Sequence, residues 1–168
     1  WGRVEESYGE DPYLCGIFAR SEVKGYLDSG ISPMLKHYGP HGNPLGGLNL
    51  ASVDCGVYDL HAVYLKPFEM VLRHLPVYAV MSTYNSWNRV PNSASRYLLT
   101  DILRNRWGFK GYVYSDWGAI EMLENFHHTA ANKAEAATQA LTAGLDVEAS
   151  SECYPELSRL VKEGKLEE

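Results

Sequence analysis

The sequence lacks the features that indicate a nucleic-acid, membrane or metal-binding protein. Its 15 lysines and arginines are scattered among 21 acidic residues, with no basic block to follow a phosphate backbone. No apolar run approaches the roughly 20 residues that cross a bilayer, and the N-terminus shows no apolar signal-peptide region. Cys15, Cys55 and Cys153 are too few and too widely spaced for a disulfide framework or a zinc site, so we expect buried thiols. We predict no nucleic-acid partner and no membrane partner.

Signals for a cofactor or metal are equally scarce. No G-x-G-x-x-G turn follows a predicted strand, which removes the main support for a dinucleotide site. His127 and His128 lie near two acidic residues, but adjacent side chains point in different directions and no third ligand recurs at a suitable spacing. We therefore predict that these histidines lie on the surface. No metal and no cofactor is expected.

The residues that are present suffice for one α/β domain. A chain of 168 residues with 45% hydrophobic content can bury a core. Hydrophobic periodicity predicts strands at 31–35, 77–82, 111–115 and 145–148. Helices are predicted from Asp11-Pro12 to Gly30, over 59–75 with a kink at Pro67, and over 93–106, 118–125, 132–143 and 154–163. This alternation indicates a parallel sheet covered by helices, either doubly wound or part of a (β/α)₈ barrel.

Polar side chains gather where three of these strands end. Lys36-His37 follows the first strand, Tyr84-Asn85 the second and Asp116-Trp117 the third. The carboxyl ends of parallel strands share one face, where barrel active sites lie. Taken singly, each residue has a plainer explanation, such as a helix cap for Asp116 or loop surface for Lys36-His37. The joint pattern favours a site. Asp146, at the end of the last strand, is interpreted as structural, and Glu10-Asp11 as a helix cap.

Seven stretches, in order along the chain, resemble the signatures of glycoside hydrolase family 3, the β-glucosidase and β-xylosidase family. They are Trp1–Pro12 (W-G-R-x-x-E-S-x-x-E-D-P), Leu35–Tyr38 (L-K-H-F), Tyr64–Phe68 (Y-L-x-P-F), Met81–Asn85 (M-S-x-Y-N), Leu99–Gly111 (L-T-x-x-L-R-x-x-W-G-F-x-G), Ser115–Trp117 (S-D-W) and Ala143–Asp146 (A-G-x-D). The resemblance implies a partial (β/α)₈ TIM-type barrel over 1–168, about half of a barrel and a single, incomplete catalytic domain.

The resemblance also implies a chemistry. It makes Asp116 the nucleophile of a retaining, exo-acting β-glycosidase that forms a covalent glycosyl-aspartate intermediate. The residues matching Arg3, Lys36 and His37 donate hydrogen bonds to sugar hydroxyls. Tyr84 matches a residue beside the nucleophile, and Trp117 one that packs against the sugar on the leaving-group side.

The implied partners are a β-linked oligosaccharide or glycoside, the missing barrel strands, and a C-terminal domain with the acid/base. Both of these parts are expected to lie outside this chain, which would leave sheet edges unpaired and this fragment inactive on its own. For a bacterial member, a periplasmic or secreted location is expected.

Three departures from the family pattern bear on specificity and local structure. The family's frequent G-G-R is Gly46-Gly47-Leu48 here, so the arginine contact to the sugar is expected to be absent or supplied by another part of the protein. Asn88-Arg89 replaces the usual Asn-Gly, which places a non-glycine residue where φ is expected to be positive. The run from His37 to Gly42 is similar to that of the family's β-N-acetylglucosaminidases, but 43–54 lacks their histidine, so that branch is rejected.

Several alternatives stay open at this point. The enzyme could be a β-xylosidase or a bifunctional xylosidase/glucosidase instead of a β-glucosidase. The chain could be a non-catalytic sugar-binding fragment, and a metal-dependent barrel hydrolase is the least favoured reading. Arg3 could simply pair with Glu5 or Glu6, and Trp117 could be part of a wall and not a stacking platform.

Overall fold

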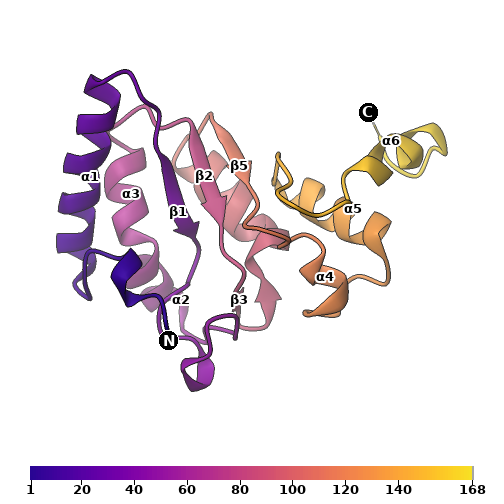
Figure 1. The fold of residues 1–168 in the computed structure, drawn as a ribbon, viewed down its shortest axis with the longest axis horizontal. Coiled ribbons are helices and arrows are strands. Elements are labelled where there is room, and N and C mark those ends of the chain that lie inside the picture. The colour runs from indigo at the N-terminus through magenta and orange to yellow at the C-terminus, as the bar shows by residue number, and fades with distance from the viewer. Residues whose placement is uncertain (168) are drawn as a thin grey trace.

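The computed structural model describes residues 1–167 as an α/β structure built on a parallel sheet. The sheet has three strands in the order β1 (Met34–Tyr38), β2 (Ala79–Ser82) and β5 (Tyr112–Tyr114). Met34 pairs with Ala79, and Ala79 with Tyr112. In Figure 1 the helices α1 and α3 lie beside the β1 end of the sheet, and α4, α5 and α6 lie beyond β5. The predicted α/β class with parallel strands is confirmed.

Two of the four predicted strands differ from the structure. The first begins at Met34, because Pro33 has no backbone N–H to donate and Ile31 is exposed. Lys36 and His37 therefore lie inside β1 and not after it. The predicted strand at 145–148 is reduced to an isolated parallel bridge between Tyr114 and Val147. It still extends the sheet, since the backbone N–H of Ser115 donates to the carbonyl of Val147.

The helices with clear end signals lie where the sequence predicted them. Helix α1 (Pro12–Asp28) is capped by the Asp11 side chain, which accepts from the N–H of Leu14 at 2.7 Å. Helix α5 (Lys133–Ala143) ends at Gly144, which is left-handed, with φ of 108°. Helix α6 spans Pro155–Lys162. The helix predicted over 118–125 is shorter than expected, because 118–121 forms turns and α4 spans only Met122–Asn125.

The segment 59–75 was predicted as one kinked helix, but it is divided into α2 (Val57–Asp59), η3 (Leu60–Tyr64) and α3 (Lys66–Leu72). In η3 the turns are wide, and the N–H of Leu65 donates five residues back to Leu60. Pro67 lies in the first turn of α3, where its missing N–H costs nothing. The predicted kink at Pro67 is therefore wrong. The interruption is the wide helix η3, which ends at Tyr64, before the proline.

A second wide helix follows the second strand. Instead of one helix over 93–106, a short turn η4 (Asn92–Ala94) leads into η5 (Tyr97–Arg106), which has i→i+5 bonds such as that from Trp107 N–H to the Ile102 carbonyl. Ahead of it lies the hairpin β3 (Ser86–Trp87) and β4 (Val90–Pro91). Its turn has φ of 47° at Asn88 and 72° at Arg89, which confirms the expected positive φ at a non-glycine residue.

The main core lies between the sheet and the helices that follow it. Its fully buried members include Leu98, Leu99, Leu103, Val113 and Leu145. Close packing of β5 on β2 depends on Gly111, because a Cβ there would lie 2.2 Å from the carbonyl oxygen of Tyr78.

Two short turns complete the elements, η1 (Val4–Glu6) and η2 (Leu45–Gly47), and η2 lies in the long loop between β1 and α2. All three cysteines are free thiols, and Cys153 is buried as predicted, whereas Cys15 and Cys55 are partly exposed. No helix among residues 1–167 is long and apolar enough to cross a membrane.

Candidate active site

Asp116 lies just beyond the carboxyl end of β5, with its side chain held at one oxygen and free at the other. The residue is only 7% exposed. Its Oδ1 accepts a hydrogen bond from the backbone N–H of Trp117 at 2.7 Å. Its Oδ2 is buried and has no hydrogen-bond partner within the described chain. A buried carboxylate with one unpaired oxygen is costly in a purely structural role.

His37 reaches toward Asp116 from β1 and is held by Arg3. Nε2 of His37 lies 3.0 Å from Nη2 of Arg3 and 3.4 Å from Oδ2 of Asp116. Because a guanidinium can only donate, Nε2 must accept, and the ring proton resides on Nδ1. Burial, and after it the nearby His41, Arg3 and Lys36, lowers the pKa of His37 to about 3. The ring is therefore neutral at neutral pH, and the contact between His37 and Asp116 joins two acceptors and is not an ion pair.

Arg3 and Lys36 share one carboxylate, that of Glu6. Nε and Nη2 of Arg3 donate to Oε1 and Oε2 of Glu6 at 2.7 and 2.8 Å, in a bidentate pair. Nζ of Lys36 donates to Oε2 at 3.1 Å. Arg3 thus pairs with Glu6, as the plainer alternative allowed, and contacts His37 as well. Lys36, which the resemblance makes a donor to sugar hydroxyls, has Glu6 as its ion-pair partner in the structure.

Tyr84 and Trp117 complete the group around Asp116. Tyr84 follows β2, and burial, the negative charge of Asp116 and the closeness of the Tyr84 hydroxyl to that carboxylate raise the pKa of Tyr84 to about 12. Trp117, next to Asp116 in the chain, is 72% exposed within residues 1–167, and its role as stacking platform or wall stays a prediction. The structure therefore gathers Arg3, His37, Tyr84, Asp116 and Trp117 at the carboxyl edge of the sheet, with Lys36 joined through Glu6.

His127 is a neighbour of the site that the sequence did not reveal. Its Nε2 lies 2.9 Å from the carbonyl oxygen of Tyr84, and the ring is half-buried, which lowers its pKa. His127 is thus only partly exposed, whereas His128 is exposed as expected. A contact to a backbone carbonyl 43 residues away leaves no local signal in the sequence. Among residues 1–167, no three His, Cys, Asp or Glu side chains gather as metal ligands.

Behind His37 lies a second histidine, His41, that sequence reasoning also missed as a site neighbour. Its ring centroid is 4.4 Å from that of His37, and the edge of Trp1 packs on it at 4.8 Å. Nδ1 of His41 lies 2.7 Å from Oδ1 of Asn85 and 2.8 Å from Oγ1 of Thr83. The amide of Asn85 donates to two carbonyls of the loop at 49–51, which fixes its orientation. Thr83 and Asn85, which lie in the M-S-x-Y-N stretch, thus hold the His41 ring in place next to His37.

Asp146 is not part of this group. Its Oδ2 accepts from Nη2 of Arg104 at 2.5 Å and from the backbone N–H of Val113 at 2.6 Å. These bonds attach the segment after α5 to β5, in agreement with the predicted structural role.

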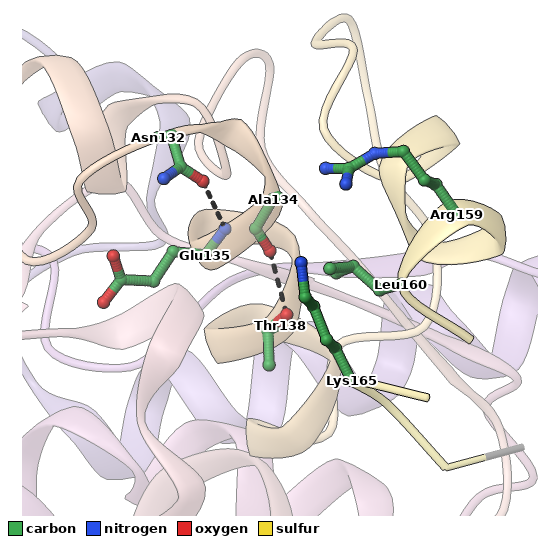
Figure 2. A pocket seen from close by; sticks show the side chains of 7 residues that line it. All are labelled: Asn132, Ala134, Glu135, Thr138, Arg159, Leu160 and Lys165. Atoms are coloured by element: carbon green, nitrogen blue, oxygen red, sulfur yellow. Dashed lines mark hydrogen bonds between the residues drawn. The ribbon is translucent and has the colours of Figure 1, made fainter. Parts of the chain in front are cut away.

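A separate hollow of about 350 Å³ lies between α5 and α6 (Figure 2). Its lining consists of Asn132, Ala134, Glu135, Thr138, Arg159, Leu160 and Lys165. The hydrogen bonds drawn in Figure 2 belong to α5 itself: Asn132 caps the N–H of Glu135 at 3.0 Å, and Thr138 donates to the Ala134 carbonyl at 2.8 Å. Asn132 and Thr138 thus serve α5, and Arg159 and Lys165 pair with Glu163, so these polar groups already have partners within the structure.

Comparison with known proteins identifies the family of the chain. The family model for the glycosyl hydrolase family 3 N terminal domain matches residues 1–168. The chain is 38% identical to a periplasmic beta-glucosidase of Salmonella typhimurium, over 99% of the chain and 22% of that protein. It is 36% identical to a beta-xylosidase of Formosa agariphila, over 88% of the chain and 22% of that protein.

Solved structures give the same result. The β-glucosidase EmGH1 of Erythrobacter marinus has a TM-score of 0.95 at 35% identity, over 99% of this chain and 23% of that one. The beta-glucosidase of Listeria innocua in complex with glucose has a TM-score of 0.93 at 32% identity, over 99% and 24% respectively. The chain thus spans less than a quarter of the length of these relatives. Through the match along its whole length to that N-terminal domain, the chain belongs to glycosyl hydrolase family 3.

Proposed function

We propose that the natural protein is a retaining, exo-acting β-glycosidase whose nucleophile is Asp116. The observation that carries this proposal is the buried Asp116 carboxylate, with Oδ1 held by the Trp117 N–H and Oδ2 unpaired beside Arg3 and His37. An ionised carboxylate with a free oxygen at the edge of a parallel sheet is what displacement at a sugar carbon requires. The names of the relatives, beta-glucosidase and beta-xylosidase, support the same reaction class.

The proposed chemistry has two displacements. Oδ2 of Asp116 attacks the anomeric carbon, the bond to the leaving oxygen breaks, and a carboxylic acid protonates that oxygen. The resulting glycosyl ester on Asp116 is then attacked by water, which the same second carboxyl group deprotonates, and the sugar leaves with its original configuration. Arg3, Lys36 and His37 bind the sugar hydroxyls, and Trp117, exposed beside the nucleophile, packs against the sugar on the leaving-group side.

The acid/base does not belong to the group around Asp116. Apart from Asp116 itself, the carboxylate of that group is Glu6, which is bound by two cations, and these lower its pKa to about 2. A general acid needs the opposite, a carboxyl group that keeps its proton near neutral pH. We therefore infer that the acid/base comes from a further domain of the natural polypeptide, and that residues 1–168 form one incomplete (β/α)₈ barrel domain.

The substrate is proposed to be a terminal β-linked glucoside of an oligosaccharide or glycoside. Similar proteins carry both names, beta-glucosidase in Salmonella typhimurium and exo-1,4-beta-xylosidase in Emericella nidulans, so a β-xylosidase or bifunctional enzyme is the second candidate. A non-catalytic sugar-binding role for the chain is the third. Relative kcat/KM on aryl β-glucoside and aryl β-xyloside separates the first two, and turnover of either by the natural protein excludes the third.

Trapping of the intermediate tests the proposal directly. A 2-fluoro β-glucoside with an activated leaving group slows hydrolysis of the ester, so the natural protein should gain the mass of one fluorosugar. Peptide mapping is expected to place that mass on Asp116. A label on Asp101 or Asp146, or stable activity in a protein that takes up no label, would contradict the assignment.

A further inference from the structure

Glu6 occupies an unusual position, between two cations that come from distant parts of the chain. It ends the short turn η1, three residues after Arg3, while Lys36 comes from β1. The carboxylate accepts two bonds from Arg3 and one from Lys36. Its side chain remains one-third exposed, so an alternative conformation in water was available to it. Each hydrogen bond that the Glu6 carboxylate accepts in the described structure comes from Arg3 or Lys36.

We infer that Glu6 is a positioning residue, which holds the guanidinium of Arg3 and the ammonium of Lys36 in the arrangement that binds the sugar. This inference rests on the function proposed above, because it assigns sugar binding to both cations. Glu6 acts through them and touches neither the reacting atoms nor, in the described contacts, Asp116.

The physical argument begins with the two like charges. Arg3 and Lys36 both lie within hydrogen-bond distance of one carboxylate oxygen, Oε2 of Glu6, at 2.8 and 3.1 Å. Without that charge the two cations repel each other, and long flexible side chains respond by turning into water. The bidentate pair with Arg3 also fixes the plane of the guanidinium, which a single bond would not do.

The second step leads from Arg3 to the nucleophile. The same Nη2 atom that donates to Glu6 also lies 3.0 Å from Nε2 of His37. This contact keeps the lone pair of Nε2 occupied and the ring proton on Nδ1. If Arg3 swings away, His37 can take the other tautomer and donate to Oδ2 of Asp116, 3.4 Å away. Glu6 thus supports both the sugar contacts and the unpaired state of the proposed nucleophilic oxygen.

The chain supplies a matched control next to Glu6. Glu5 lies in the same turn η1, is exposed, and takes part in none of the hydrogen bonds or ion pairs found over 1–167. Glu6→Gln and Glu5→Gln remove the same charge from adjacent positions with the same change of shape. A difference between the two variants therefore reports the contacts of Glu6 and not net charge.

The first test measures kinetics of the full-length natural protein on an aryl β-glucoside. Glu6→Gln should raise KM by about tenfold or more, with a smaller change in kcat, because contacts to non-reacting hydroxyls stabilise substrate and transition state alike. Glu5→Gln should match the unmodified protein. If Glu6 merely kept the N-terminal segment folded, the variant would lose active protein and apparent kcat at unchanged KM. That result, or an equal rise of KM in Glu5→Gln, overturns the inference.

The second test does not depend on turnover. In crystal structures of the full-length protein and its Glu6→Gln variant, Arg3 and Lys36 should leave their positions while the backbone of η1 and β1 stays in place. Cations that keep their positions in the variant overturn the inference, whether or not the protein is a glycosidase. Conversely, displaced cations in a protein that neither turns over glycosides nor takes up a fluorosugar would refute the proposed function and leave the structural role of Glu6 standing.

A double-mutant cycle tests whether Glu6 acts through Lys36. In a Lys36→Met background, Glu6→Gln should raise KM by a factor at least about threefold smaller than it does alone, because part of its effect acts through Lys36. Strictly multiplicative effects would show that Glu6 does not act through Lys36, and would contradict the inference for this cation.

Discussion

Nε2 of His37 and Oδ2 of Asp116 lie 3.4 Å apart, and both atoms are acceptors. Arg3 brings about this arrangement by occupying the His37 lone pair at 3.0 Å. A donor at this position would satisfy Oδ2 and make it a poorer nucleophile. Two facing acceptors instead leave an unsatisfied oxygen that a donor or an electrophile from the substrate can approach.

We expect replacement of Asp116 to remove chemistry and spare binding. Asp116→Asn is nearly isosteric, so the full-length protein should lose about 10³- to 10⁶-fold in kcat while its affinity for glucose changes little. Asp116→Gly opens space for azide, which should restore part of the turnover of an aryl glucoside. Kinetics and calorimetric titration measure the two effects. Retained turnover in Asp116→Asn would show that another group attacks.

Replacement of Asp146 should give the opposite pattern. Asp146→Ala leaves the N–H of Val113 without its side-chain acceptor and removes the carboxylate partner of Arg104, so we expect a loss of about 1 to 3 kcal/mol in the free energy of unfolding. Activity of the protein that remains folded should be unchanged. Denaturant unfolding combined with active-site titration separates the two quantities. A loss of turnover per folded molecule would place Asp146 in the chemistry after all.

Trp117→Ala should affect catalysis without affecting folding. The indole is 72% exposed, so its removal should change the free energy of unfolding by no more than about 0.5 kcal/mol. Loss of an aromatic surface against the sugar should lower kcat/KM about tenfold. Trp117→Phe is the conservative control and should retain more of the activity than alanine does. Equal kcat/KM in all three proteins would show that Trp117 does not contribute to catalysis.

The buried neutral state of His37 predicts a pH dependence of stability. Its pKa is lowered from 6.5 to about 3 in the folded protein. Between these values the unfolded chain binds a proton that the native state does not. The free energy of unfolding should therefore be highest above pH 6.5 and fall with decreasing pH, by up to about 1.4 kcal/mol per pH unit, until about pH 3.

Urea midpoints measured across that window should show a shallower slope for His37→Gln than for the unmodified protein. Histidines that do not touch His37 contribute equally to both proteins and cancel, so His41, which packs on His37, is replaced by glutamine in both proteins of the comparison. An identical slope would mean that His37 is already protonated in the native state, and the tautomer assigned from Arg3 would then be incorrect.

Gly111 provides a test of the packing between β2 and β5. In Gly111→Ala the new Cβ would lie 2.2 Å from the Tyr78 carbonyl oxygen, so the strands must separate, at a cost of about 1 to 3 kcal/mol. Gly25→Ala is the matched control, since nothing lies within 4 Å of a Cβ at that helical position. It should stabilise the protein by about 0.5 to 1 kcal/mol. Thermal unfolding of the two variants should therefore shift in opposite directions.

Local chemistry explains what the sequence could predict. Helix α1 was predictable because Asp11-Pro12 starts it and Gly30 follows it, both within a few residues of the ends. Asp116 and Tyr84 were predictable as site candidates because each follows a strand directly. The start of β1 was not predictable from the apolar run at 31–35, because Pro33 delays the strand until Met34. The break in the 59–75 helix was missed because wide turns follow no apolar period.

At the site, the sequence could not predict contacts between residues that are far apart in the chain. The pairing of Lys36 with Glu6 joins positions 30 apart, and His127 meets the Tyr84 carbonyl across 43 residues. The motif stretches contain Arg3, Glu6, Lys36 and His37, and a pairing of Arg3 with Glu5 or Glu6 was an open alternative. The bond from Lys36 to Glu6 and the packing of His41 on His37 left no local signal in the sequence.

Strand β1 has a further consequence for work with this chain. It is the outer strand of the three-stranded sheet, so the backbone groups along its free side have no strand partner among residues 1–167. An unpaired edge is a template for another copy of the same strand, and Lys36 is the charged side chain of β1 that opposes such pairing. Expressed alone, the 168-residue piece is expected to aggregate through β1, whereas a polypeptide that supplies a neighbouring strand should remain dispersed.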